Sequence, residues 1–141
     1  MPDNAITLLR TKFGNKVLSF TDYVSGALTA ATIKKEWVVP FFCSIVDVIV
    51  DSETNGVGGG TGTIIDVNRN GTSIYTTQAN RPTLRANDTG NYKWQTNGTV
   101  PRQIPDVTRL VPGDVLSYDV DQIQTTSGVT RTKIAIIVDN R

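Results

Sequence analysis

Three groups of residues in this sequence have types and spacings that could support chemistry, and the first resembles the start of a calcium-binding loop. Residues 66–71 read D-x-N-x-N-G, but such a loop also needs a glutamate at its twelfth position, which here is Thr77, and a helix on each side. The flanking residues instead alternate as strands do, and Asn70-Gly71 between two strands is the strongest short hairpin signal because both central residues need positive φ. We therefore predict a turn here.

The second group is a pair of carboxylates, Asp119 and Asp121, on one face of a predicted strand. Two neighbouring carboxylates can act as a general acid and base or hold a cation. Because Leu116, Tyr118 and Val120 form the opposite, apolar face, and because the chain has no histidine, we interpret the acidic face as the solvent side of a sandwich strand.

The third group combines cationic and aromatic side chains in one predicted loop: Arg81, Arg85, Lys93 and Trp94. Stacking and hydrogen bonding by such residues could bind a sugar or an anion. The favoured alternative is that they line a loop or a contact between subunits.

A glycine-rich run at residues 56–62 invites comparison with nucleotide-binding loops, since glycine lets backbone amides approach a phosphate. The run matches neither G-x-x-x-x-G-K-[ST] nor G-x-G-x-x-G, and no strand-loop-helix pattern surrounds it. We predict a flexible loop between strands.

Composition indicates one all-β domain with a short appendage. The chain has 141 residues, of which 38% are hydrophobic and 19% charged; strand-forming and turn-forming residues outnumber helix formers. A formal net charge of +1 argues against a dedicated nucleic-acid binder. The lone Cys43 lies in an apolar run, where we expect a small buried side chain without a disulfide. Without a signal peptide or an 18-residue apolar run, we expect no membrane contact.

Short strands punctuated by turns predict a two-sheet β-sandwich with a jelly-roll topology at residues 37–141, preceded by an N-terminal arm at residues 1–36. Within the arm, we expect short strands at 17–20 and 27–33. Past Pro40, the alternation assigns Ser44, Val46, Val48 and Val50 to one face and Ile45, Asp47 and Ile49 to the other. Residues 62–70 and 72–77 form the first predicted hairpin, and residues 114–123 and 130–140 the second, which places Ile134, Ile136 and Val138 on one face. Exposed sheet edges in so small a domain favour oligomerisation.

The residues also carry a resemblance to a known family. Residues 38–51 (VVPFFCSIVDVIVD), 62–84 (GTIIDVNRNGTSIYTTQANRPTL) and 107–123 (VTRLVPGDVLSYDVDQI) resemble the jelly-roll domain of bacteriophage virion proteins. That domain forms the tip of some tail fibres and the body of capsid decoration, or cement, proteins. The resemblance covers about residues 37–138 and implies a structural protein with no catalytic residue, cofactor or metal.

Within that family, a chain that begins at Met1 with few residues before the domain favours capsid decoration. The resemblance then implies a homotrimer on the outer surface of the phage head, with the major capsid protein and its own copies as partners and no nucleic acid or membrane. The alternative is a tail-fibre head that recognises host glycan through Tyr92, Trp94 and the loop at 87–99. For capsid attachment the candidates lie in the arm, where apolar and basic side chains mix: Leu8, Leu9, Arg10, Lys12, Phe13 and Lys16.

Overall fold

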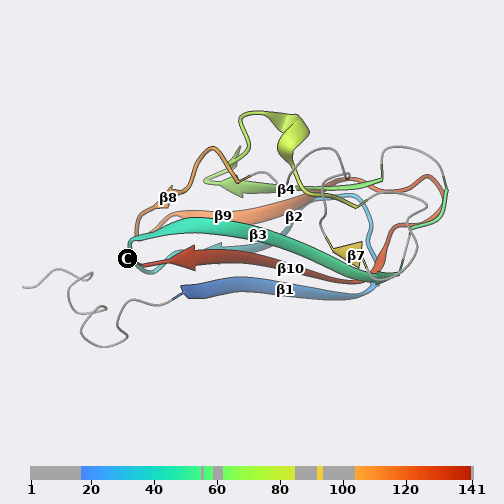
Figure 1. Cartoon of the computed structure of the whole chain (residues 1–141), viewed down its shortest axis with the longest axis horizontal. Helices are drawn as coiled ribbons and strands as arrows, with labels where there is room; N and C mark the ends of the chain where they lie inside the picture. Colours follow the sequence, from blue (N-terminus) through green and yellow to red (C-terminus); the bar gives the residue numbers. More distant parts are fainter. Residues whose placement is uncertain (1–16, 55, 59–61, 85–91, 94–103, 141) are drawn as a thin grey trace, which may run out of the picture.

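The computed structural model describes residues 17–54, 56–58, 62–84, 92–93 and 104–140, and these form two antiparallel sheets packed face to face. The strands are β1 (Val17–Ala27), β2 (Ala31–Val38), β3 (Cys43–Thr54), β4 (Thr63–Arg69), β5 (Thr72–Ser73), β6 (Thr83–Leu84), β7 (Tyr92–Lys93), β8 (Arg109–Leu110), β9 (Val115–Gln122) and β10 (Thr130–Asp139). One short 3-10 helix, η1 (Gln78–Asn80), lies over the second sheet (Figure 1).

The order of the strands is that of a jelly roll. Sheet A runs β1-β10-β3-β7, with β8 also paired to β3, and sheet B runs β2-β9-β4-β5, with β6 also paired to β4. Strands that follow one another along the chain, such as β1 and β2 or β3 and β4, lie in opposite sheets. The predicted all-β jelly-roll sandwich is therefore confirmed.

The core lies between the sheets and is built by alternation along the long strands. Ile134, Ile136 and Val138 of β10 are completely buried, and Leu116 and Tyr118 of β9 face them from sheet B. The faces predicted for both strands are thus correct. An apolar side chain at every second position removes one face of each sheet from water, which supplies most of the folding free energy.

The pairing predicted for these two strands is wrong, because β9 and β10 do not form a hairpin. β9 pairs with β2 and β4, whereas β10 pairs with β1 and β3. The connection at 123–129 crosses between the sheets and is anchored by Gln124, which is fully buried and accepts a hydrogen bond from the Thr63 hydroxyl at 2.7 Å. In the same connection, Gly128 packs against the backbone of Leu28 so closely that a Cβ at this position would lie 2.3 Å from the Leu28 carbonyl oxygen.

The predicted faces of β3 are also wrong in its first half. Ile137 of β10 pairs with Asp47, and its neighbour Val138 pairs with Ile45, so Val46 is an extra residue in a β-bulge. Ile45 and Val48 both point inward as a result. The Asp47 carboxylate accepts the Val48 N–H at 2.8 Å beside the bulge. Strict alternation across the bulge misassigned the strand.

The sandwich begins before the expected boundary at residue 37. β1 pairs with β10 over its length, and β2 pairs with β9, so residues 17–36 contribute a strand to each sheet. The strand expected at 27–33 is displaced, since Leu28 is buried between the sheets and its N–H donates to the Val129 carbonyl at 2.8 Å. Residues 1–16 of the expected arm lie outside the described residues.

The first hairpin has the predicted turn but a shorter second strand. Asn70 and Gly71 have φ values of +50° and +79°, as the Asn-Gly turn requires. β5 ends at Ser73, whereas the sequence pattern extends to residue 77. The Asp106 carboxylate accepts the N–H groups of Thr76 and Thr77 at 2.8 and 3.3 Å, and this bends the chain away from the sheet.

Two neighbouring isoleucines on β10 test this architecture. Ile136 is fully buried, whereas Ile137 is only half-buried on the outer face. We expect Ile136→Ala to lower the free energy of unfolding by about 2–5 kcal/mol through lost burial and a cavity, and Ile137→Ala by roughly 1 kcal/mol or less. Urea denaturation of both variants measures the difference. Equal losses would contradict the assignment of faces.

Candidate functional site

Asp119 and Asp121, which the sequence assigns to the solvent face of a strand, lie on the outer face of sheet B, and both carboxylate oxygens of Asp119 accept hydrogen bonds there. Its Oδ1 accepts the backbone N–H of Ile33 on β2 at 2.6 Å, and its Oδ2 accepts the Asn68 side-chain amide on β4 at 2.8 Å. Since β9 lies between β2 and β4, a single side chain ties three strands together. Asp119 thus acts as a cross-strand clamp rather than a freely solvated carboxylate.

Asp66 lies directly opposite Asp119 on β4 and is almost completely buried, with 7% of its surface exposed. The Ser73 hydroxyl donates to its Oδ1 at 2.7 Å. Burial raises the pKa of Asp66 above its ordinary value, and the negative charges of Asp121 and Asp119 add to this, against the lowering effects of Ser73 and Arg81. Asp66 is therefore a desolvated carboxyl group on the outer face of sheet B.

Asp121 forms an ion pair with Arg81, whose Nε also donates to the Gln78 carbonyl at 2.8 Å. The guanidinium that was a candidate for an anion or sugar site therefore serves to hold the η1 segment against sheet B. Arg85 and Trp94 lie outside the described residues, as does the side chain of Lys93, so that hypothesis stays a prediction. The same applies to the glycan-binding loop at 87–99, of which the structure describes only the backbone of β7.

A second cross-strand carboxylate, not predicted from the sequence, is Asp114, which directly precedes β9. Its oxygens accept hydrogen bonds from Arg69 Nε, Asn70 Nδ2 and the Val111 N–H, each at 2.8 Å. Burial opposes ionisation of Asp114, but these three donors outweigh it and lower its pKa. The available signal was an Arg-Asn-Gly turn together with a Pro-Gly-Asp turn, both rich in groups that pair locally.

The side chains of the D-x-N-x-N-G motif form four separate hydrogen bonds instead of binding one cation. Asp66 accepts from Ser73, Asn68 donates to Asp119, and Asn70 donates to Asp114 while accepting the Val115 N–H at 2.8 Å. In the part of the chain that the structure describes, no group of three or more His, Cys, Asp or Glu side chains is placed to hold a metal ion. The predicted turn is confirmed.

The described part of the glycine run and Cys43 are both packed into the sandwich. Val57 forms an isolated bridge with Ser127, and Gly56 packs against Gln124 so closely that a Cβ would lie 2.1 Å from its side chain. Cys43 is a free, buried thiol, as predicted. Burial, followed by the charge of Asp114, raises its pKa to about 11, which leaves the thiol protonated and unreactive at neutral pH.

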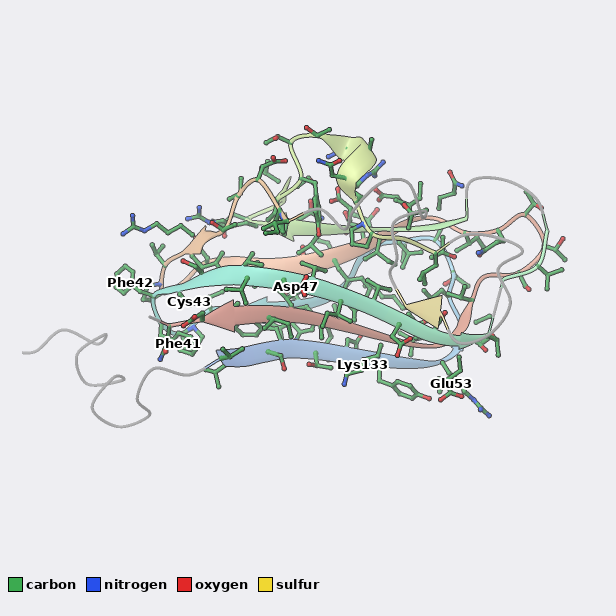
Figure 2. All side chains as sticks on the ribbon, in the orientation of Figure 1. Phe41, Phe42, Cys43, Asp47, Glu53 and Lys133 are labelled. Carbon is green, nitrogen blue, oxygen red and sulfur yellow. The ribbon has the colours of Figure 1, made fainter. Side chains whose placement is uncertain are left out.

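The described surface is most apolar along the side formed by β1 and β2, which we call the β1–β2 side. Ten large hydrophobic side chains are exposed among the described residues, and five belong to these two strands: Val17, Leu18, Tyr23, Ile33 and Val38. β1 and β2 are each the outermost strand of their sheet on the same side of the sandwich (Figure 1). Phe42, which is also exposed, lies where β3 begins, at the opposite end of that strand from Glu53 (Figure 2). This distribution is typical of an interaction surface.

Behind this side, aromatic rings connect the two sheets. Phe20 of β1 and Trp37 of β2 have ring centroids 6.2 Å apart, and Trp37 stacks on Tyr118 at the same separation. The Tyr118 hydroxyl donates to Asp22 at 2.7 Å, and burial together with that carboxylate raises the pKa of Tyr118. The β1–β2 side therefore covers a packed aromatic interior.

The arm residues proposed for attachment, at positions 8–16, lie outside the described residues. Comparison of the chain with protein-family models, curated proteins and solved structures finds no match. Within the described ranges, no helix has the length and apolar character needed to cross a membrane.

The two buried carboxylates predict opposite dependences of stability on pH. Because the pKa of Asp114 is lowered by folding, its contribution to stability is present above the ordinary carboxyl pKa and is lost as pH falls through the lowered value. We expect Asp114→Asn to reduce the free energy of unfolding by about 1.5–3 kcal/mol at neutral pH, and by less in acid. Urea denaturation across the acidic range measures this.

Asp66→Asn is the matched comparison. Because folding raises the pKa of Asp66, the wild-type protein loses stability as pH rises from the ordinary carboxyl pKa through the raised value. The asparagine variant, which keeps the acceptor for Ser73, should therefore improve relative to wild type as pH rises. If both variants changed in the same direction with pH, the assignments of these carboxylates would be wrong.

Proposed function

We propose that this protein is a structural component of a bacteriophage particle, a decoration protein that binds the outer surface of the head as a homotrimer and stabilises it. The observation that carries the proposal is that polar groups on the surface of the sandwich have structural roles, whereas exposed apolar side chains are concentrated on one side. Of the carboxylates that were candidates for chemistry on sheet B, Asp119 joins strands and Asp121 holds the η1 segment, while exposed apolar side chains gather on the β1–β2 side. The jelly-roll architecture and the resemblance of residues 37–138 support the same function.

A decoration protein of this kind works by binding alone. Three copies related by a rotation axis repeat one modest contact with the shell three times, and after the first contact forms the others meet their sites at high effective concentration. The partners in this proposal are the major capsid protein and further copies of the chain. No cofactor, metal or catalytic group takes part.

Binding to heads tests the proposal. Purified protein should co-sediment with empty heads of the phage that encodes it and should raise the temperature at which those heads melt in calorimetry. Analytical ultracentrifugation of the protein alone at low concentration should give the mass of three chains. Protein that remains in the supernatant at saturating head concentration, or heads whose melting is unchanged, would rule the function out.

A pair of arm variants tests the attachment site. Replacing Leu8, Leu9 and Phe13 with serine removes apolar contacts, each worth about 1.5–3 kcal/mol when buried, so we expect head affinity to fall at least tenfold, the equivalent of about 1.4 kcal/mol. A second variant replaces the basic candidates Arg10, Lys12 and Lys16 with serine, which separates the charged contacts from the apolar ones. If neither triple variant weakens binding, attachment does not involve the arm.

A further inference from the structure

Among the described strands, β1 alone offers a long, regular and unpaired edge. Its register with β10 is continuous from Val17 to Val24, and no strand of the described structure pairs with its other side. At the far side of both sheets the described edge strands β5, β6, β7 and β8 have two residues each. Short edges resist pairing with another chain, whereas a long flat edge is a template for it. Figure 1 shows β1 along the free margin of sheet A.

The neighbouring edge, β2, is closed by a strained bulge. Its register with β9 is interrupted between Ala31 and Lys35, and Ile33 within the interruption has a φ of +52°, an unfavourable conformation for a β-branched residue. The Asp119 carboxylate fixes this geometry by accepting the Ile33 N–H at 2.6 Å. The bulge and the consecutive charges at 34–36 are both features that prevent edge pairing.

The outer-face residues of β1 are self-complementary about Phe20. On its outer face the order is Val17, Ser19, Thr21 and Tyr23, which reads apolar, hydroxyl, hydroxyl, apolar, and both terminal members are 57% exposed. The face follows from the register, in which Tyr23 lies beside Lys133, an exposed residue on the outside of sheet A (Figure 2).

The inner face of the same stretch contains the only charged residue of β1, Asp22, and this carboxylate is turned toward the other sheet. It accepts the Tyr118 hydroxyl at 2.7 Å and is half-buried. An inward-pointing charge can block an edge when it lacks a partner. Here the partner is supplied from within the sandwich, so the edge stays open.

We propose that β1 pairs antiparallel with β1 of a second copy of this chain, about a two-fold axis at Phe20. On the outer face this register places Val17 opposite Tyr23 of the second copy and Ser19 opposite Thr21, so apolar meets apolar and hydroxyl meets hydroxyl there, while Leu18 lies opposite Asp22 on the inner face. It also keeps outer faces together, as the two-residue period of strands demands. A shift of the axis to Thr21 would instead place Tyr23 opposite Ser19 and Val17 opposite Ser25.

This two-fold contact goes beyond the proposed function. A homotrimer needs a head-to-tail contact between unlike surfaces, whereas β1 pairing with β1 uses the same surface on both chains. On a shell the two contacts are compatible, since the two-fold contact would join neighbouring trimers. The sheet would continue from one copy into the next as β3-β10-β1-β1-β10-β3.

Cysteine pairs test the contact and its register. In the double variant Val17→Cys with Tyr23→Cys, mild oxidation should give a covalent dimer on a non-reducing gel. Each single variant alone should stay uncrosslinked, because identical positions lie roughly 20 Å apart in this register. Mixing the two single variants should restore the dimer. Buried Cys43 in the wild-type chain is the background control.

The outcomes separate this inference from the proposed function. A dimer in either single variant, or none in the double variant and the mixture, overturns the pairing. Hydrogen exchange of the wild-type chain gives a second measurement without substitutions, since protection of the β1 amides should rise with protein concentration. Head binding is measured on the same samples: binding without crosslinks removes only the β1 contact, and crosslinks without binding remove only the decoration function.

Discussion

The β1–β2 side of the sandwich depends on contacts made by two adjacent residues of β9, Tyr118 and Asp119. They point to opposite faces because successive side chains of a strand alternate. Tyr118 lies in the core, stacks on Trp37 of β2 and donates to Asp22 of β1 in the other sheet. Asp119, on the outer face, accepts from β2 and from β4. One step along the chain thus connects β9 to three further strands.

This arrangement explains why polar groups that look chemical in the sequence have structural roles. A central strand has neighbours on both sides, so an outer carboxylate on it is always within reach of two other strands. Where those strands offer a donor, such as the Asn68 amide or the N–H freed by the β2 bulge, the carboxylate becomes a cross-strand contact. Hydrogen bonds to a charged group are the stronger kind, at about 1.5–3 kcal/mol. They also fix the register, because a slip of one residue would move Asp119 to the core face.

The sequence predicts well what depends on local pattern and poorly what depends on distant partners. The Asn70-Gly71 turn and the inner faces of β9 and β10 were predictable, because turn chemistry and period-two alternation are properties of a few neighbouring residues. The assignment of β9 and β10 to different sheets was not, since alternation identifies a face and not a neighbour. The faces of β3 were mispredicted for a related reason. The extra residue Val46 reverses the inward and outward positions on one side of the bulge relative to the other, and only the register with β10 reveals it.

The same limit applies to the surface. Sequence alone assigns Asp119 and Asp121 to solvent, whereas Ile33 and Arg81, both far away along the chain, are the partners that define their roles.

The asymmetry between the two edges of the β1–β2 side follows from the contact between Asp119 and Ile33. A strained residue such as Ile33 costs on the order of 1–3 kcal/mol and persists only where its surroundings fix it. Asp119 provides that constraint on β2, and within the described residues no such bulge interrupts the stretch of β1 from Val17 to Val24. The carboxylate that stabilises sheet B therefore also determines which edge of the sandwich remains open.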